Sequence, residues 1–186
     1  MTENIESNLF RSLNALGALA VSIVLITALY DQFVHGDLPC PLCLLQRIGF
    51  GAVLCGLILN VVKGPRPGHY SMMIIAAFFG AAVALRQVSL HVIPGSPGYG
   101  NLFFGMHYYT WAFIVFSIII LGTAVIAAYS TQYHKPRFIR FADQPVVCKL
   151  AIVVAPAVVA INVVAAFAEC GPGQCPDNPT SYWLSG

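Results

Sequence analysis

Hydrophobic residues in this chain gather into five long runs, separated by short polar, glycine- or proline-containing segments. A helix needs about 20 consecutive apolar residues to cross the hydrocarbon core of a bilayer. All five runs are long enough, and they predict helices over roughly 13–33, 44–62, 71–93, 108–129 and 146–168. Gly64 and Pro65 follow the second run and Pro94 follows the third, as expected of residues that end helices. The pattern predicts an all-α membrane protein.

The composition agrees with this prediction. Of the 186 residues, 58% are hydrophobic and only 9% are charged, whereas soluble domains carry about 25% charged residues. The basic residues are scattered, so the net charge of +2 does not indicate a nucleic-acid-binding surface. The five runs and their connections account for the whole chain and leave no room for a separate soluble domain.

The basic residues predict the orientation of the helices, because Lys and Arg accumulate in short cytoplasmic connections. With a cytoplasmic N-terminus, most of the nine Lys and Arg lie on the cytoplasmic side: Arg11, Lys63, Arg66, Lys135, Arg137, Arg140 and Lys149. The segments expected outside are 34–43, 94–107 and the tail after Ala168, and they contain no Lys or Arg. The N-terminus carries Glu3 and Glu6 instead of the basic cluster of a signal peptide, so we expect a retained first span.

Two cysteine pairs lie in the segments expected outside. The motif Cys40-Pro-Leu-Cys43 directly precedes the second run. The motif Cys170-Gly-Pro-Gly-Gln-Cys175 closely follows the fifth run. Disulfides persist outside the cytosol, and an exposed disulfide on a short turn is labile. We therefore expect the second pair to exchange with a soluble thiol protein and with the first pair.

Two arginines are not explained by the orientation. Arg47 lies about one helical turn into the second run, and Arg86 about two turns from the outer end of the third run. An arginine at this depth either snorkels to the interface or finds a partner. Two arginines beneath a dithiol favour a ligand with oxygen acceptors, such as a quinone, because arginine stabilises negative charge on a carbonyl oxygen. Arg47 also favours the thiolate of Cys43.

Other polar and aromatic residues extend this expected quinone site. Gln87 and His91 lie four residues apart and share a helix face. Further residues stand at the outer ends of the second and fourth runs: Gln46, Tyr108, Tyr109 and Trp111. We expect Leu102, Phe103 and Phe104 in the second outer segment to lie at the membrane interface and to cover the same pocket.

The sequence around the first cysteine pair resembles a known family. The stretch Pro39-Cys40-Pro-Leu-Cys43-Leu-Leu-Gln-Arg47 is similar to DsbB, the quinone-dependent thiol oxidase of the bacterial inner membrane. That family carries a C-x-x-C pair at the outer end of its second span and an arginine four residues further on. The stretch from Arg86 to Leu90 is similar as well, and we expect the resemblance to cover the first four runs.

The resemblance implies a four-helix transmembrane bundle, which we expect over residues 1–145. The fifth run departs from the family and predicts a further helix with a periplasmic tail over 146–186. The resemblance also implies that ubiquinone or menaquinone binds against Cys43 and Arg47, and that a DsbA-like periplasmic thioredoxin-fold protein is reoxidised. Better-known members carry the second pair between the third and fourth spans, where this chain has no cysteine. The expected catalytic residues are Cys40, Cys43, Cys170 and Cys175, and the expected quinone-binding residues are Arg47, Arg86, Gln87 and His91.

Three alternatives remain. The same two pairs suit a reductase that relays electrons outward. A non-enzymatic membrane protein would use the cysteines in structural disulfides. Thiolates, alone or together with His91 and His107, would suit a metal-handling protein, although one C-x-x-C and one C-x-x-x-x-C at opposite ends of the chain form a weak zinc pattern.

Overall fold

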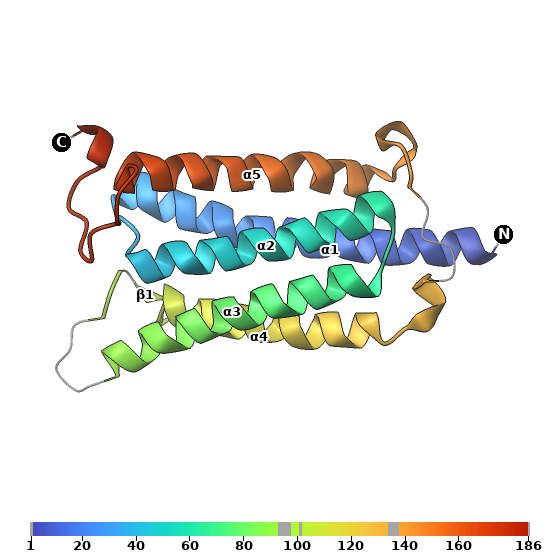
Figure 1. Ribbon diagram of the computed structural model, residues 1–186, viewed down its shortest axis with the longest axis horizontal. Helices are drawn as coiled ribbons and strands as arrows, with labels where there is room; N and C mark the ends of the chain where they lie inside the picture. Colours follow the sequence, from blue (N-terminus) through green and yellow to red (C-terminus); the bar gives the residue numbers. More distant parts are fainter. Residues whose placement is uncertain (1, 93–97, 101, 134–137, 186) are drawn as a thin grey trace.

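Long helices run side by side along one axis in the computed structural model, which describes residues 2–92, 98–100, 102–133 and 138–185 (Figure 1). The described residues form five such helices: α1 (Thr2–Tyr30), α2 (Pro41–Lys63), α3 (Pro67–His91), α4 (Tyr108–Ala127) and α5 (Val146–Cys170). Each is long and apolar enough to cross a membrane. The prediction of an all-α bundle of four helices plus a fifth is confirmed.

Two prolines set the starts of helices. α2 begins at Pro41 and α3 at Pro67, because the first helical turn needs no backbone N–H and suits proline. Cys40 is the N-cap of α2, and its sulfur accepts a hydrogen bond from the backbone N–H of Cys43 at 3.3 Å. The first cysteine motif is thus part of the start of a helix.

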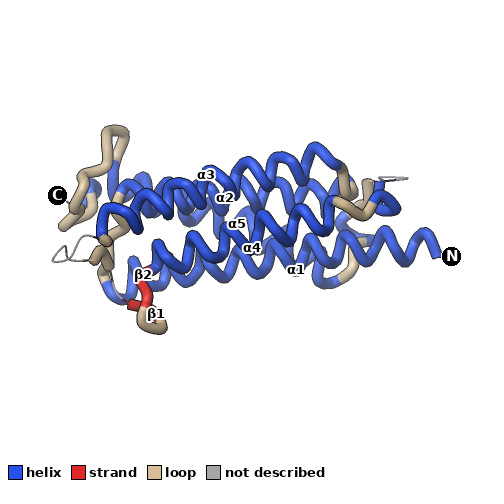
Figure 2. The backbone as a smooth tube through the Cα atoms, turned by 90° about the horizontal axis from the view of Figure 1, so that it is seen from below, coloured by secondary structure: helices blue, strands red, loops and turns tan. Residues whose placement is uncertain are grey.

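Short elements complete the chain, and the hydrophobic pattern did not predict them. One turn of π-helix, η1 (Asp31–His35), extends α1 and ends at Gly36, whose φ is 73°. A hairpin of β1 (Leu102–Phe103) and β2 (Met106–His107) precedes α4 (Figure 2). The 3-10 turns are η2 (Ser130–Tyr133), η3 (Phe141–Asp143) and η4 (Trp183–Ser185). Strands of two residues are too short to show an alternating pattern.

The packing order brings the two cysteine motifs to one end of the bundle. α2 packs against α1 and α3, α3 packs against α4, and α5 packs against α1 and α2. Helices that follow one another along the chain alternate in direction, so that α2 and α4 begin where α1, α3 and α5 end (Figure 1). We call this the thiol end of the bundle.

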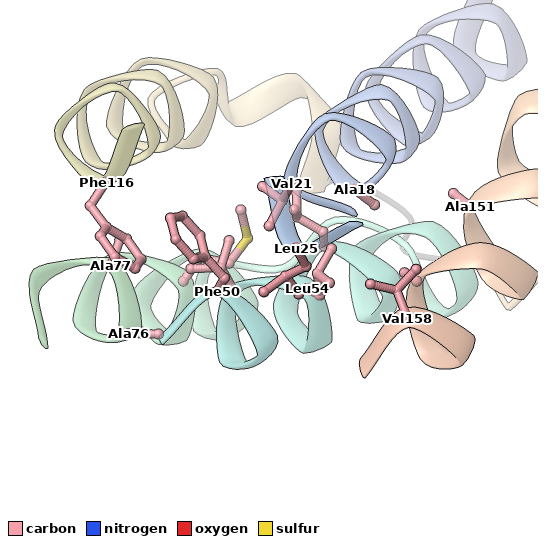
Figure 3. Packing of buried hydrophobic residues seen from close by; sticks show 14 of the residues in the cluster. Ala18, Val21, Leu25, Phe50, Leu54, Ala76, Ala77, Phe116, Ala151 and Val158 are labelled. Carbon is pink, nitrogen blue, oxygen red and sulfur yellow. The ribbon is translucent and has the colours of Figure 1, made fainter. Parts of the chain in front are cut away.

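Close helix contacts in the centre depend on small residues, as in other membrane bundles. The rings of Phe50 and Phe116 stack with centroids 3.9 Å apart, and Phe116 lies directly against Gly80. Figure 3 shows this layer with alanine, valine and leucine side chains from the neighbouring helices. The central core is therefore tightly packed.

At the opposite end of the bundle, Arg11 has a structural contact in addition to its expected place on the cytoplasmic side. Its side chain is fully buried. Its guanidinium donates to the carbonyl oxygens of Val61 and Val62, in the last turn of α2, where carbonyls lack helical partners. Arg11 thus caps a helix. Three predicted features lie outside the described residues: the end of the third run at residue 93, the helix stop at Pro94, and Lys135 with Arg137.

Candidate redox site

The first cysteine pair is held by glutamines from two helices. The sulfurs of Cys40 and Cys43 lie 2.7 Å apart. Gln87 of α3 is buried, and its Nε2 donates to the Cys40 sulfur at 3.2 Å and to the Cys43 sulfur at 3.4 Å. Gln46 Nε2 in turn donates to Gln87 Oε1 at 2.7 Å. The structure therefore brings Gln87 to the sulfurs themselves, in a position to orient them.

The two cysteines differ in environment. The side-chain hydrogen bond with Cys43, together with burial, raises the pKa of Cys40 above its ordinary value of 9.0. Cys40 is thereby kept as a thiol. Cys43 lies in the first turn of α2, where the positive end of the helix dipole favours negative charge, and it lines a cavity. Of the two cysteines, Cys43 is the one that borders this cavity.

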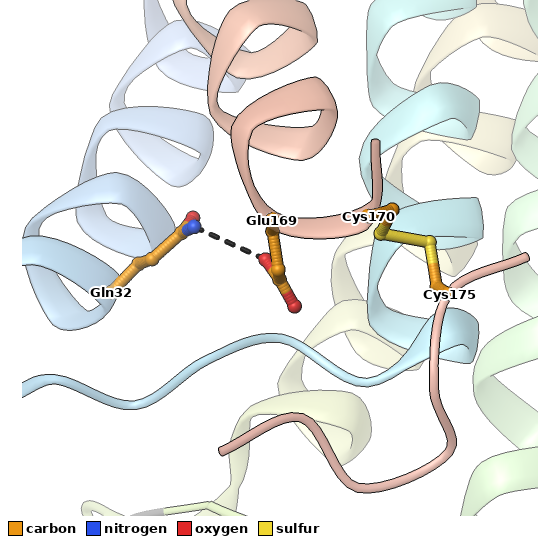
Figure 4. Close-up of a disulfide and its surroundings, with 4 residues drawn as sticks. All are labelled: Gln32, Glu169, Cys170 and Cys175. Carbon is orange, nitrogen blue, oxygen red and sulfur yellow. Dashed lines mark hydrogen bonds between the residues drawn. A yellow bond between two sulfur atoms is a disulfide. The ribbon is translucent and has the colours of Figure 1, made fainter. Parts of the chain in front are cut away.

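Arg47 reaches across to α1. Its Nη1 donates to Gln32 Oε1 at 2.7 Å, and its Nη2 donates to the carbonyl oxygen of Ala28 at 3.0 Å. Gln32 Nε2 continues the chain of hydrogen bonds to Glu169 Oε2 at 3.2 Å (Figure 4). These contacts connect α2, α1 and α5 next to the first cysteine pair, and they fix the position of the guanidinium.

A cavity of about 360 Å³ lies beside these residues, between α1, α2 and α4. Cys43 and Arg47 both line it. Most of the wall is apolar, with Ile23, Val24, Leu25, Phe50, Ala112 and Val115. The polar wall residues are Asp31, Asp37, Gln46, Tyr99, Tyr108 and Tyr109. A volume of about 300–1,000 Å³ with apolar walls and a few fixed polar groups is typical of a small-molecule site.

The hairpin before α4 closes one side of this cavity. Phe103 lines the cavity, and its carbonyl oxygen accepts a hydrogen bond from Trp111 Nε1 at 2.8 Å. The ring of Phe103 stacks on Tyr108 with centroids 6.0 Å apart. Leu102 and Phe104 are exposed. Of the three residues expected to cover the pocket, Phe103 is the one that reaches it.

Arg86 and His91 lie differently from Gln87. Arg86 is exposed on α3 and is not among the described residues that line the cavity. His91 Nδ1 lies 2.8 Å from the carbonyl oxygen of Gln87, and its ring stacks on Tyr109 with centroids 5.3 Å apart. Tyr109 lines the cavity. His91 therefore contacts a residue of the cavity wall.

The second cysteine pair forms a disulfide at the end of α5, with Cα atoms of Cys170 and Cys175 4.6 Å apart (Figure 4). The tail after it folds back on the bundle. The Trp183 ring packs over Gly171, where a Cβ would lie 2.6 Å from the ring and where φ is 63°. The ring of Tyr182 stacks on Phe33 with centroids 6.5 Å apart. The pair is thus held at the thiol end and does not hang on a free tail.

The sequence interpretation did not include Gln32, Glu169 and Asp31. Single polar residues at the ends of apolar runs are usually interfacial, and nothing in the pattern singled these out. Two local signals were present: Glu169 directly precedes Cys170, and Asp31 lies four residues before His35. Within the part of the chain that the structure describes, no three His, Cys, Asp or Glu side chains gather as a metal site requires.

Comparison with known proteins separates the two halves of the chain. Residues 10–98 match the family described as Disulfide bond formation protein DsbB. They contain most of α1, together with α2, α3, the first cysteine pair and Arg47. This part of the chain is similar to the DsbB family. The DsbB match thus ends before α4, although we expected the resemblance to extend over the fourth run.

Similar proteins named Disulfide bond formation protein B align over the same part. The protein of Stutzerimonas stutzeri (strain A1501) is 40% identical over 91 residues, which cover 45% of this chain and 54% of the relative. That of Xanthomonas euvesicatoria pv. vesicatoria (strain 85-10) is 37% identical over 90 residues, covering 46% and 52%. That of Chromobacterium violaceum (strain ATCC 12472) is 42% identical over 71 residues, covering 36% and 43%.

The chain thus spans about half the length of the first DsbB relatives that it matches. No solved structure matches it. The second cysteine pair, α4 and α5 lie outside the matched residues.

Proposed function

We propose that this protein is a thiol oxidase of the bacterial inner membrane. It takes electrons from a periplasmic, DsbA-like thioredoxin-fold protein and passes them through Cys170/Cys175 and Cys40/Cys43 to a membrane quinone. The observation that carries the proposal is that Cys43 and Arg47 line one apolar cavity beside the dithiol. The similarity of residues 10–98 to the DsbB family and the position of both pairs at one end of the bundle support it.

The residues of the cavity fit a quinone head group. A flat ring with two carbonyl oxygens needs apolar and aromatic walls and at least one hydrogen-bond donor. Phe50, Tyr108 and Tyr109 supply rings, and Arg47 supplies the donor. A guanidinium has five N–H donors, and the bonds to Gln32 and Ala28 occupy two of them. A bound ubiquinone or menaquinone would supply a two-electron acceptor that is soluble in the bilayer.

The electron path consists of two disulfide exchanges and one oxidation. A thiolate of the partner attacks the Cys170–Cys175 disulfide, and the partner leaves with its own disulfide while the tail becomes a dithiol. The tail dithiol then reduces a Cys40–Cys43 disulfide by the same chemistry. Cys43, with Arg47 beside it, passes the two electrons to the quinone, and the Cys40–Cys43 disulfide is restored. The sum is partner dithiol plus quinone to partner disulfide plus quinol.

We further propose roles for the remaining parts. Gln87 holds the two reacting sulfurs, and His91 supports the cavity wall through Tyr109, consistent with their contacts. Arg86 stays a candidate for contact with the part of a longer quinone that lies outside the cavity. Residues 1–145 form the quinone-reducing unit, and residues 146–186 present the second pair. The N-terminus is cytoplasmic and the thiol end is periplasmic, consistent with the distribution of Lys and Arg.

The test is quinone reduction by the purified protein in detergent or lipid vesicles. We expect a reduced DsbA-like partner to be oxidised as quinone absorbance falls, with one quinone consumed per partner disulfide formed. Cys40→Ser should abolish the reaction, whereas Cys55→Ser is the matched control, because Cys55 is an exposed cysteine of α2 outside both pairs. No quinone reduction by the wild type, or full reduction by Cys40→Ser, would overturn the proposal.

A trapping experiment separates an exchanging disulfide from a structural one. A Cys175→Ala variant is incubated with the oxidised partner, so that the Cys170 thiolate attacks the partner's disulfide and releases one partner thiolate. The sulfur of Cys175 is no longer present to resolve the product, so a mixed disulfide between the partner and Cys170 should accumulate. The double variant Cys170→Ala/Cys175→Ala is the control. A tail disulfide with a purely structural role predicts no mixed disulfide in either variant.

A further inference from the structure

An acid at the wall of the same cavity contacts an imidazole within η1, the turn that extends α1. Asp31 lines the cavity together with Cys43 and Arg47. Asp31 is only 7% exposed, and its Oδ1 lies 2.7 Å from Nδ1 of His35. The His35 side chain is 51% exposed. The pair therefore connects the inside of the cavity with the surface at the thiol end.

The local backbone produces this pair. Residues Asp31–His35 form the π-helical turn η1, which Gly36 ends with a left-handed conformation. Single π-turns are frequent at functional sites. The ring of Tyr30 meets the His35 ring edge-on with centroids 5.5 Å apart, which fixes the imidazole at the end of the helix. The orientation of the pair is thus set by the fold.

We propose that Asp31 and His35 are the proton pathway of the quinone site. Asp31 is the acid that faces the ligand, and His35 exchanges protons between Asp31 and water at the thiol end. This inference rests on the proposed function, since it assigns residues to the same cavity. It goes beyond that function because neither residue belongs to the cysteine motifs or to the arginine site.

The reaction requires such a pathway. Two electrons and two protons must reach the quinone oxygens when the Cys40/Cys43 dithiol becomes a disulfide. Arg47 holds its proton at all working pH values, so it stabilises charge without supplying a proton. Asp31 can give a proton to a ligand oxygen and recover one through His35. Cys40 and Cys43 release two protons to the water at the thiol end, and the quinone takes up two protons through Asp31. The overall reaction therefore remains dithiol plus quinone to disulfide plus quinol.

Other titratable groups surround the pair and must be separated from it in any pH experiment. The charge of Arg47 and the Tyr108 side chain both interact with Asp31, and the backbone N–H of Asp37 donates to the Asp31 carbonyl at 3.4 Å. The groups next to the pair are Tyr30, Asp37, Arg47 and Tyr108, and Glu169 lies one residue further away, on Gln32. A pH profile is therefore informative only when variants are compared.

The test consists of three measurements on the variants Asp31→Asn and His35→Ala. Single-turnover quinone reduction by the pre-reduced protein, followed from about pH 5 to 9, reports proton transfer. Quenching of tryptophan fluorescence by quinone gives the binding affinity. Thiol exchange between the oxidised protein and a reduced partner, without quinone, reports the remaining electron path. Asp143→Asn is the matched control, because Asp143 is an exposed carboxylate on η3.

We expect Asp31→Asn to slow quinone reduction by about 100-fold, the usual contribution of a positioned acid or base, with quinone affinity and partner exchange unchanged. His35→Ala should slow the same step, and imidazole added to the buffer should restore it. Asp143→Asn should behave as the wild type.

A wild-type rate and pH profile in Asp31→Asn and His35→Ala would overturn the inference alone, as would a loss of quinone affinity that accounts for the slower reaction. A wild type that binds but never reduces quinone would overturn the proposed function and the inference together.

Discussion

The side-chain amide of Gln32 donates a hydrogen bond to the carboxylate of Glu169 at 3.2 Å, across 137 positions of the sequence. Both side chains are buried. Gln32 also accepts the hydrogen bond of Arg47, so one amide joins the cavity arginine to the residue that precedes the tail disulfide. This contact explains how α5, which lies outside the matched DsbB residues, is fastened to the redox site.

Replacing Gln32 with leucine should destabilise the protein, because it leaves Arg47 and Glu169 buried without this partner. The expected loss is about 1–3 kcal/mol, the cost of an unsatisfied buried polar group. Gln174→Leu makes the same change at an exposed position and should leave the midpoint temperature of unfolding nearly unchanged. Thermal unfolding in detergent, followed by tryptophan fluorescence, measures both. Equal midpoints for the two variants would contradict a structural role for the Gln32 contacts.

The arginine of the cavity should not tolerate lysine. Arg47 donates from two different nitrogens to Gln32 and Ala28, and a lysine ammonium cannot reproduce this fork. We expect Arg47→Lys to weaken quinone binding about 10-fold or more, equivalent to about 1.4 kcal/mol. Arg140→Lys is the control, expected to bind quinone within about twofold of the wild type, since Arg140 is exposed and directly precedes η3. Equal losses in the two variants would contradict a specific role of Arg47 in quinone binding.

Local relations in this chain could be predicted from the sequence. The five helices follow from the lengths of the apolar runs, and the spacing of four between Cys43 and Arg47 places both on one face of a helix. The structure accordingly has both residues lining one cavity. The relation between Cys40 and the start of α2 is equally local, because Pro41 sets that start.

The direction in which each helix faces and the contacts between distant helices could not be predicted in this way. Sequence gives the depth of Arg86 in its helix but not the direction in which α3 faces, and successive residues point about 100° apart. The structure turns Gln87 toward the sulfurs and leaves Arg86 exposed. The pairing of Gln32 with Glu169 depends on how α5 packs against α1, which a single sequence without tertiary contacts does not determine.

In the reduced protein, Cys40 should be alkylated more slowly than Cys43. The hydrogen bond with Cys43 and burial raise the pKa of Cys40, so little thiolate is present at neutral pH and alkylation of Cys40 should be slow. Cys43→Ala removes the first of these causes and should speed the alkylation of Cys40, measured by mass spectrometry. A Cys40 that reacts at the same rate in both proteins would contradict the assignment.

The same pKa predicts the direction of a stability change with pH. A raised pKa in the folded state stabilises the reduced protein fully below the ordinary thiol pKa of 9.0. Above that pH the unfolded chain loses its Cys40 proton while the folded protein keeps it, so stability falls. Reduced wild type should therefore lose stability above about pH 9 more steeply than Cys40→Ala. Parallel unfolding curves of the two proteins over this range would contradict the prediction.

Gly80 should be the least replaceable small residue of the core. A Cβ at this position would overlap the ring of Phe116, and that ring is fully buried against Phe50. Gly80→Ala should therefore cost about 1–3 kcal/mol, as overpacking does. Gly122→Ala on α4 is the matched control, because its Cβ would meet nothing within 4 Å and alanine favours a helix over glycine by about 1 kcal/mol. Adding Phe116→Leu to Gly80→Ala should recover part of the lost midpoint by making room for the methyl group, whereas no recovery would mean that the loss arises elsewhere.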